Sequence, residues 1–257
     1  MIAAADFASV TEQPWQGATR MQMSMLRTRY GWAAEHAVGR DILEVACGAG
    51  LGLGWLAEKA RWVEAGDIDE ENCRIARETY RGEAKIRVGR MDALELPFED
   101  GSFDVALLFE ALYYLPDVAR FLAEAGRVLS LGGRLLIATV NSEWSGFHPS
   151  PLHTRYWTAA ELVEELAHAG FATQISAAFA DAGGLRNRLK TVAAHCGCMP
   201  RTMRGKAVLK RIFYGRLDSI PARVESAGPG ERMIPAEDAG DLTHYRSLYF
   251  EARKVTE

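Results

Sequence analysis

Long hydrophobic runs, cysteine and a surplus of charge of one sign are all scarce in this 257-residue sequence. No window approaches the roughly 20 apolar residues that cross a membrane, so we expect no integral membrane segment. The first ten residues lack a basic stretch followed by an apolar run of signal-peptide length, so we expect a cytoplasmic protein. Thirty Lys and Arg against 34 Asp and Glu give a net charge of -4. This balance excludes a global basic field that would condense on nucleic acid or anionic lipid.

Cysteine is too rare for a disulfide framework. The four cysteines are unevenly placed, which favours a reducing compartment. Cys196-Gly197-Cys198 could form a redox or metal-binding pair, but no second pair at zinc spacing accompanies it. We therefore interpret the pair as unreactive and predict no metal site.

From about residue 41 the sequence alternates short apolar runs with helical periodicity, which is typical of repeated βα units around a parallel sheet. A helix is expected over 51–60, directly after the first strand and a glycine-rich turn. The predicted strands cover 42–46, 62–66, 85–88, 103–109, 134–140, 171–179 and 245–252.

Three further helices have recognisable boundary residues. Asp69 stands at an N-cap position, and Thr158 with Glu161 three residues later forms a capping box. An apolar stripe at helical spacing starts at Val118, and Gly132-Gly133 is expected to end that helix.

The two ends of the chain do not follow the βα pattern. Residues 1–40 are predicted to form an arm and a helix that leads into the first strand of a 41–257 domain. More than sixty residues separate the last two predicted strands, so about 180–244 is interpreted as an insertion, with a helical, basic segment in it. Nine Lys and Arg and no acidic residue lie between Leu185 and Leu217.

Acidic residues stand at the ends of three successive predicted strands. Glu44 precedes the glycine-rich Gly48 to Gly52 turn, where the absence of Cβ atoms lets the backbone approach a ligand. Asp67 ends the second strand, where a carboxylate can accept hydrogen bonds from both ribose hydroxyls, and Asp92 follows the third strand. This arrangement predicts a nucleoside site.

The kind of nucleoside follows from two residues. A dinucleotide fingerprint requires a third glycine where this sequence has Leu53. A carboxylate at Glu44 suits a cationic amino group better than a pyrophosphate. A ligand with adenine, ribose and an ammonium tail but no phosphate is S-adenosylmethionine.

From about Asp41 to Phe171 the sequence resembles the class I S-adenosylmethionine-dependent methyltransferases, in particular their small-molecule, ubiquinone and menaquinone methylase-like branch. Ala46 departs from the pattern, since the family usually has its first glycine there. The resemblance implies an α/β, Rossmann-like, doubly wound sheet of seven strands, in the order 3-2-1-4-5-7-6 with the last strand antiparallel. The motifs that carry the resemblance are Ile42 to Gly50, Gly66 to Asp69, Asp92-Ala93, Phe103 to Leu112 and Leu131 to Leu135.

The resemblance also implies roles for individual residues. Glu44 and the loop from Ala46 through Gly48 to Gly50 would hold the methionine moiety, and Asp67 would hold the ribose. The remaining implied contacts are Ile68 on the adenine face, Asp92 and Ala93 at the adenine edge, and the Phe109 backbone at the amino group.

The sulfonium already activates the methyl group, so a base is needed only for a poorly nucleophilic acceptor. The segment after the fifth predicted strand is where this fold presents groups to the substrate. His148, His153 and Tyr156 in that segment are candidate catalytic residues, although plain loop or substrate-binding roles stay open, and Tyr113 and Tyr114 could also face the acceptor.

The expected acceptor is a small molecule, and base methylation of nucleic acid is not expected because the Asn/Asp-Pro-Pro-aromatic motif is absent. One hypothesis is that the basic insertion recognises an anionic sugar, lipid or secondary metabolite; a solvated basic face is the alternative. A non-catalytic S-adenosylmethionine-binding regulator stays open as a function, and a NAD(P)-dependent reductase is disfavoured. The sequence leaves the oligomeric state open.

Overall fold

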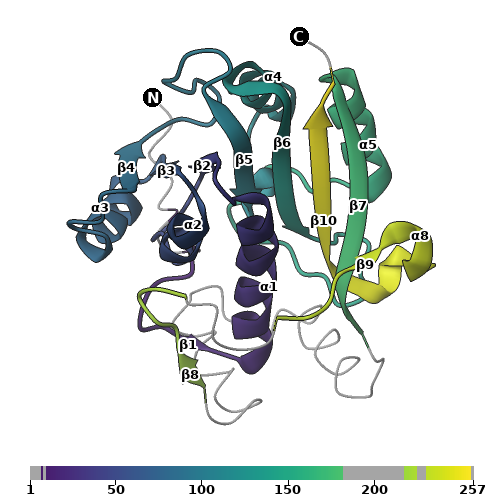
Figure 1. The fold of residues 1–257 in the computed structure, drawn as a ribbon. Helices are drawn as coiled ribbons and strands as arrows, with labels where there is room; N and C mark the ends of the chain where they lie inside the picture. Colours follow the sequence, from purple (N-terminus) through teal and green to yellow (C-terminus); the bar gives the residue numbers. More distant parts are fainter. Residues whose placement is uncertain (1–6, 8–9, 182–216, 225–229, 256–257) are drawn as a thin grey trace.

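The fold is a three-layer α/β arrangement, seen here in a computed structural model that describes residues 7, 10–181, 217–224 and 230–255 (Figure 1). The central sheet runs across the molecule, with α1 and α2 in front of it and α4 and α5 behind. The main strands are β2 (Asp41–Val45), β3 (Trp62–Asp67), β4 (Ile86–Arg90), β5 (Phe103–Phe109), β6 (Leu129–Val140), β7 (Phe171–Ala180) and β10 (Tyr245–Lys254). The longer helices are α1 (Arg20–His36), α2 (Leu53–Lys59), α3 (Glu70–Thr79), α4 (Val118–Val128) and α5 (Ala159–His168).

The sheet contains eight strands in the order β4-β3-β2-β5-β6-β10-β7-β9. The pairings among β4, β3, β2, β5 and β6 are parallel, and β10 is antiparallel to both β6 and β7. The predicted count of seven was one short, because the two-residue strand β9 (Ile234–Pro235) adds to the β7 edge. A strand of two residues has no hydrophobic alternation from which it could be predicted.

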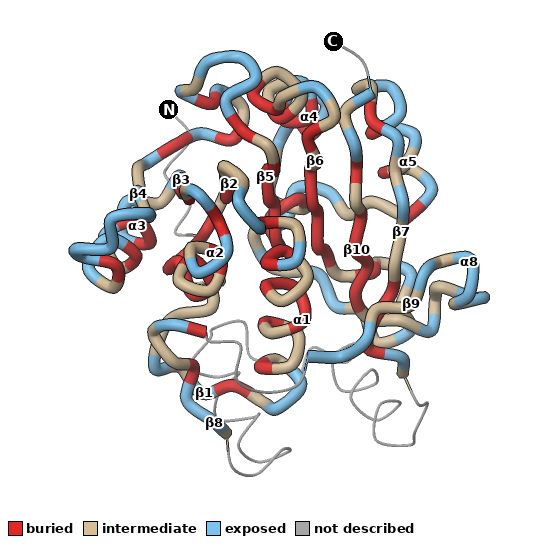
Figure 2. The backbone as a smooth tube through the Cα atoms, viewed as in Figure 1, coloured by how far each residue is buried: buried red, intermediate tan, exposed pale blue. Residues whose placement is uncertain are grey.

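Side-chain alternation along the central strands supplies a hydrophobic core to each face of the sheet. On β5, Val105, Leu107 and Phe109 belong to a buried cluster that also contains Leu26 of α1. Ala106 and Leu108, which point the other way, belong to the cluster beneath α4 and α5. Figure 2 shows the central strands as the most continuously buried part of the chain. The polar residues at the strand ends are thus carried on a rigid frame.

Helix starts follow local chemistry closely. The Asp69 side chain accepts a hydrogen bond from the backbone N–H of Glu71, which confirms the predicted N-cap of α3. Thr158 and Glu161 form the predicted capping box of α5, with both reciprocal bonds present. These ends are set by residues within one turn of the helix, so sequence alone defines them.

The expectation that Gly132-Gly133 ends a helix was wrong. α4 ends at Val128, and β6 begins at the next residue and runs through both glycines. Gly132 has a positive φ of +76°, and a Cβ on Gly133 would lie 2.8 Å from the Ser130 carbonyl oxygen. The β5–β6 register shifts in this segment, so the glycines serve a strand irregularity and a close backbone approach.

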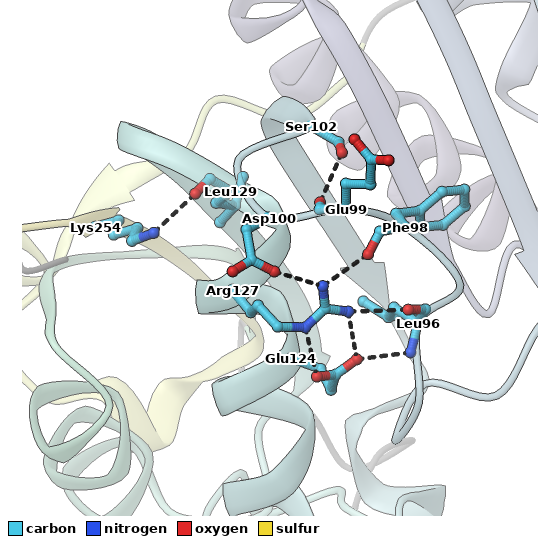
Figure 3. Close-up of polar contacts among 9 residues, drawn as sticks. All are labelled: Leu96, Phe98, Glu99, Asp100, Ser102, Glu124, Arg127, Leu129 and Lys254. Carbon is cyan, nitrogen blue, oxygen red and sulfur yellow. Dashed lines mark hydrogen bonds and ion pairs between the residues drawn. The ribbon is translucent and has the colours of Figure 1, made fainter.

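Arg127 ties the segment after β4 to α4 (Figure 3). Its guanidinium donates to the Leu96 and Phe98 carbonyls and pairs with the carboxylates of Asp100 and Glu124. The backbone N–H of Leu96 donates to Glu124 in turn. This network fixes the loop that leads from Asp92 towards β5.

The predicted insertion is described only in part. Its described pieces include β8 (Asp218–Ser219), which pairs with β1 (Gly17–Ala18), α8 (Ala236–Ala239) and the 3-10 turn Leu242–His244. The nine basic residues, Cys196 and Cys198 lie outside the described residues. Within the described part of the chain, no helix is long and apolar enough to cross a membrane. No group of three or more His, Cys, Asp or Glu there could hold a metal ion.

Candidate active site

A cavity of about 570 Å³ opens at the carboxyl ends of β2, β3, β4 and β5. It brings together residues that lie far apart in the sequence, as expected for the switch point of an open α/β sheet. Eight of the nine predicted cofactor residues line it: Glu44, Ala46, Gly48, Asp67, Ile68, Asp92, Ala93 and Phe109.

Asp67 organises the loop beside it. One carboxylate oxygen accepts from the backbone N–H of Gly48 at 2.9 Å, and the other accepts from the backbone N–H of Asp69 at 2.9 Å. Asn72 of α3 adds a weaker bond at 3.3 Å. The residue is only 6% exposed, so its carboxylate faces the cavity and not bulk solvent. Asp67 therefore joins the end of β3 to the glycine loop that follows β2.

The glycine loop has an unusual backbone. Gly48 and Gly50 have positive φ angles of +55° and +71°, and so does Ala46 at +55°. A Cβ on Gly50 would lie 2.9 Å from Cβ of Ala76, so Gly50 permits close packing of the loop on α3 and does not line the cavity. Ala46 adopts the left-handed conformation that glycine takes without strain.

Glu44 is a buried carboxylate in β2, 1% exposed. The Tyr30 hydroxyl of α1 donates to its Oε1 atom at 2.7 Å, while its Oε2 atom has no hydrogen-bond partner among the described residues. Burial raises the pKa of Glu44 to about 7, opposed by the Tyr30 hydrogen bond and by the charge of Arg29. A buried, singly bonded carboxylate that lines a cavity is suited to a cationic ligand group.

The far end of the cavity suits a planar ring. Ile68 is 45% exposed, which is uncommon for a large aliphatic side chain, and it lines the cavity directly after β3. Asp92 is exposed and Ala93 is buried after β4, and the Asp92 carboxylate accepts from the backbone N–H of Leu94. A planar ring such as adenine can bind between this apolar surface and the carboxylate.

At the opposite end lies a charged cluster that the sequence did not reveal. Arg29 of α1 is buried and pairs with Glu12 of the N-terminal arm at 2.5 Å. Glu110, directly after β5, lies near this pair and accepts a hydrogen bond from the Tyr113 hydroxyl at 3.2 Å. The arm and α1 carry no periodic or motif signal that places these side chains in the cavity. Glu110 lies within the motif from Phe103 to Leu112, directly after a predicted strand. That position is the sequence signal that could have identified it as a cavity residue.

The three predicted catalytic residues do not line the cavity. His148 and His153 are exposed, and the His153 ring contacts the Ser150 carbonyl. Tyr156 stacks on Tyr113, with ring centroids 4.8 Å apart, and its hydroxyl accepts from the backbone N–H of Ser150. Their catalytic role stays a prediction. Tyr113 and Tyr114 do line the cavity.

Residues 43–137 match a family described as "Methyltransferase domain". Residues 43–137 are thus a methyltransferase domain. A probable S-adenosylmethionine-dependent methyltransferase of Mycolicibacterium smegmatis is 38% identical over 148 residues, which cover 55% of this chain and 56% of that protein. A phthiotriol/phenolphthiotriol dimycocerosates methyltransferase of Mycobacterium ulcerans is 40% identical over 102 residues, covering 38% and 36%. The chain spans about half or less of the length of these relatives.

Solved structures share the fold of most of this chain, including the methyltransferase domain. A methyltransferase from Thermotoga maritima, described as a possible histamine N-methyltransferase, superposes with a TM-score of 0.56 at 16% identity over 91% of this chain and 92% of that one. The [4+2]-cyclase SpnF superposes with a TM-score of 0.61 at 19% identity over 96% and 86%. At these identities the likeness shows the fold alone.

S-adenosylmethionine is the cofactor that the methyltransferase domain implies, and the residues present fit it. The buried Oε2 atom of Glu44 lacks a partner among the described residues, as a site for an ammonium group requires. A Cβ on Gly48 would lie 2.7 Å from Cγ2 of Thr11, so glycine lets the arm and the loop approach each other closely where both line the cavity. Asp67 and Ile68 follow on the next strand in the same cavity.

Proposed function

We propose that the chain transfers the methyl group of S-adenosylmethionine to a small-molecule acceptor. The observation that carries this proposal is that Glu44, Asp67 and Asp92, at the ends of three successive strands, meet in one cavity. Three carboxylates at these places match the ammonium, ribose and adenine groups of the cofactor in strand order.

The cofactor supplies an activated methyl group, so the protein's task is to bind, orient and exclude water. Glu44 holds the ammonium group, with Tyr30 fixing the carboxylate, and Asp67 holds the ribose hydroxyls. Ile68 packs on the adenine, whose edge meets Asp92 and Ala93. The part of the cavity lined by residues 109–116, α1 and the N-terminal arm is left for the acceptor.

The charges that line the cavity favour a neutral or positively charged acceptor. Arg29 is the sole Lys or Arg among the described lining residues, and Glu12 already neutralises it. Five carboxylates line the same cavity: Glu12, Glu44, Asp67, Asp92 and Glu110. The described lining therefore gives no support to an anionic acceptor.

The test is methyl transfer from S-adenosylmethionine with a labelled methyl group to a panel of small phenols, alcohols and amines. We expect a labelled product and one equivalent of S-adenosylhomocysteine. Binding of S-adenosylhomocysteine without transfer to any compound would favour the regulator, and binding of a nicotinamide cofactor in its place would favour the reductase.

A variant of Asp67 tests cofactor binding independently of methyl transfer. Asp67→Ala removes the ribose contact and the anchor of the Gly48 N–H, so we expect S-adenosylhomocysteine to bind about 1 to 3 kcal/mol more weakly in calorimetry. Asp238→Ala, an exposed aspartate of α8, is the control and should bind as the wild-type protein does. An unchanged dissociation constant for Asp67→Ala would contradict the assigned site.

A further inference from the structure

Glu110 directly follows β5 and has a strained backbone conformation. Its φ of +53° is a left-handed conformation that costs a non-glycine residue of order 1 kcal/mol or more. Its backbone N–H donates to the Ala138 carbonyl at 2.8 Å, so pairing with β6 continues through this residue. The side chain lines the cavity and accepts from the Tyr113 hydroxyl. The backbone therefore holds one carboxylate at a fixed place in the cavity.

The order of strands locates Glu110 relative to the cofactor. The sheet runs β4, β3, β2, β5, and the cofactor groups assigned above follow the same direction: adenine at β4, ribose at β3 and methionine at β2. Val45 of β2 pairs with Leu108 of β5, so the end of β5 lies directly beside the end of β2. The next carboxyl group that this sheet edge presents to the cavity after Glu44 is that of Glu110.

We propose that Glu110 is the catalytic residue that faces the transferring methyl group and accepts the proton of the acceptor, whose nucleophile is a hydroxyl or an amine. This inference rests on the proposed function. The lone pair of the nucleophile bonds to the methyl carbon, and the carbon–sulfur bond breaks with its electron pair left on sulfur. The proton of the nucleophile passes to a Glu110 carboxylate oxygen. The methylated acceptor and S-adenosylhomocysteine leave, and Glu110 releases the proton to solvent.

The surroundings suit Glu110 to this task at neutral pH. Burial raises its pKa to about 7, and the Arg29 charge opposes that rise. A carboxyl group with a pKa near the working pH is an effective proton acceptor. The titratable and charged groups that face it come from the arm, α1, the turn after β5, the loop after β6, and β10: Glu12, Arg29, Tyr113, Tyr114, Tyr156 and Tyr249.

The test compares the binding of two cofactor analogues and needs no acceptor. S-adenosylhomocysteine lacks the transferring methyl group. Sinefungin carries an amino group on a carbon in place of the methyl-bearing sulfur, so its ammonium marks the position of that methyl. We expect the wild-type protein to bind sinefungin more tightly than S-adenosylhomocysteine in calorimetry. Glu110→Gln should weaken sinefungin about tenfold, or about 1.4 kcal/mol, and change S-adenosylhomocysteine less than twofold.

Ionisation of Glu110 gives a second readout. The preference of the wild-type protein for sinefungin should increase between pH 6 and pH 8, whereas the preference in Glu110→Gln should be flat. Taking the ratio of the two affinities removes the contribution of Glu44, which acts on both ligands. Glu110→Asp keeps the charge and should retain part of the preference, and Glu143→Gln, an exposed residue outside the cavity lining, should retain all of it.

The outcomes separate this inference from the proposed function. Equal weakening of both ligands by Glu110→Gln would show a structural role and overturn the inference, as would an unchanged preference. Failure of the wild-type protein to bind either ligand would remove the proposed function itself, and the inference with it.

Discussion

At the scale of single residues, Ala46 shows the backbone conformation that the glycine loop requires. It has a φ of +55° directly after β2, where glycine would be free of strain. The backbone turn is therefore retained although the side chain opposes it. This is the position at which the sequence departs from the methyltransferase pattern.

Replacing Ala46 by glycine should stabilise the protein. Relief of left-handed strain is worth roughly 1 to 2 kcal/mol. This exceeds the roughly 0.5 to 1 kcal/mol that the greater freedom of glycine in the unfolded chain costs. We expect Ala46→Gly to raise the free energy of unfolding in urea by about 0.5 to 1 kcal/mol. Ala57→Gly inside α2 is the matched control and should lower it by a similar amount; a loss at both positions would argue against strain at Ala46.

Sequence could bring the residues proposed to bind the cofactor to one cavity, because each stands at the end of a strand that its own apolar run defines. Glu44, Asp67 and Asp92 needed only the parallel sheet to bring them together. Arg29 and Glu12 could not be placed in this way. Their positions depend on how α1 and the arm pack across the sheet, and neither segment encodes that packing in a local pattern.

At the scale of elements, Arg127 is a connection between segments and not a surface ion pair. It bonds two backbone carbonyls and two carboxylates and so links the loop after β4 to α4 (Figure 3). Arg74, by contrast, pairs with Glu71 and Glu78 within α3 alone.

The two arginines make a matched pair of substitutions. Arg127→Lys loses the forked geometry and leaves carbonyls unpaired, so we expect a loss of about 1 to 2 kcal/mol in the free energy of unfolding. Arg74→Lys breaks exposed pairs within one helix and should cost less than about 0.5 kcal/mol. Urea denaturation measures both, and equal losses would contradict a connecting role for Arg127.

Some boundaries of helices and strands are set by nearby residues, and others are set by pairing with a distant strand. The caps at Asp69 and Thr158 are closed by residues a few positions away and were predicted. The Gly132-Gly133 pair was misread because its role depends on β5, which lies outside its local sequence. β9 was missed for the same reason, since only its pairing with β7 defines it.

For the molecule as a whole, two carboxyl groups couple folding to pH: Glu44, which is buried, and Glu110, which is half-buried. Burial raises the pKa values of Glu44 and Glu110 from 4.5 to about 7. The folded state thus binds protons more tightly than the unfolded state. The stability from this source is complete below about pH 4.5 and is lost as the pH rises towards 7.

A double variant isolates this effect. We expect the ligand-free wild-type protein to lose stability, relative to Glu44→Gln/Glu110→Gln, as the pH rises from 5 to 7.5. Urea denaturation at a series of pH values measures the difference. Glu143→Gln/Glu237→Gln, two exposed sites, is the control and should follow the wild-type curve. Parallel curves for the wild-type protein and the first variant would show that the pKa values of the two carboxyl groups are not raised in the folded state.

The walls of the cavity come from two stretches of chain that meet at Gly39. Before it lie Glu12, Arg29 and Tyr30, and after it lie the nucleoside end and residues 109–116. Gly39 is exposed and has a φ of +68°, and a Cβ there would meet no atom within 4 Å, so the joint has room around it but needs glycine for its backbone. A single recombination point at this turn can exchange the arm and α1 between homologues while the chain after Gly39 stays unchanged. Chimeras that keep Tyr30, which bonds Glu44 across this joint, offer a route to new acceptor ranges without redesign of the nucleoside pocket.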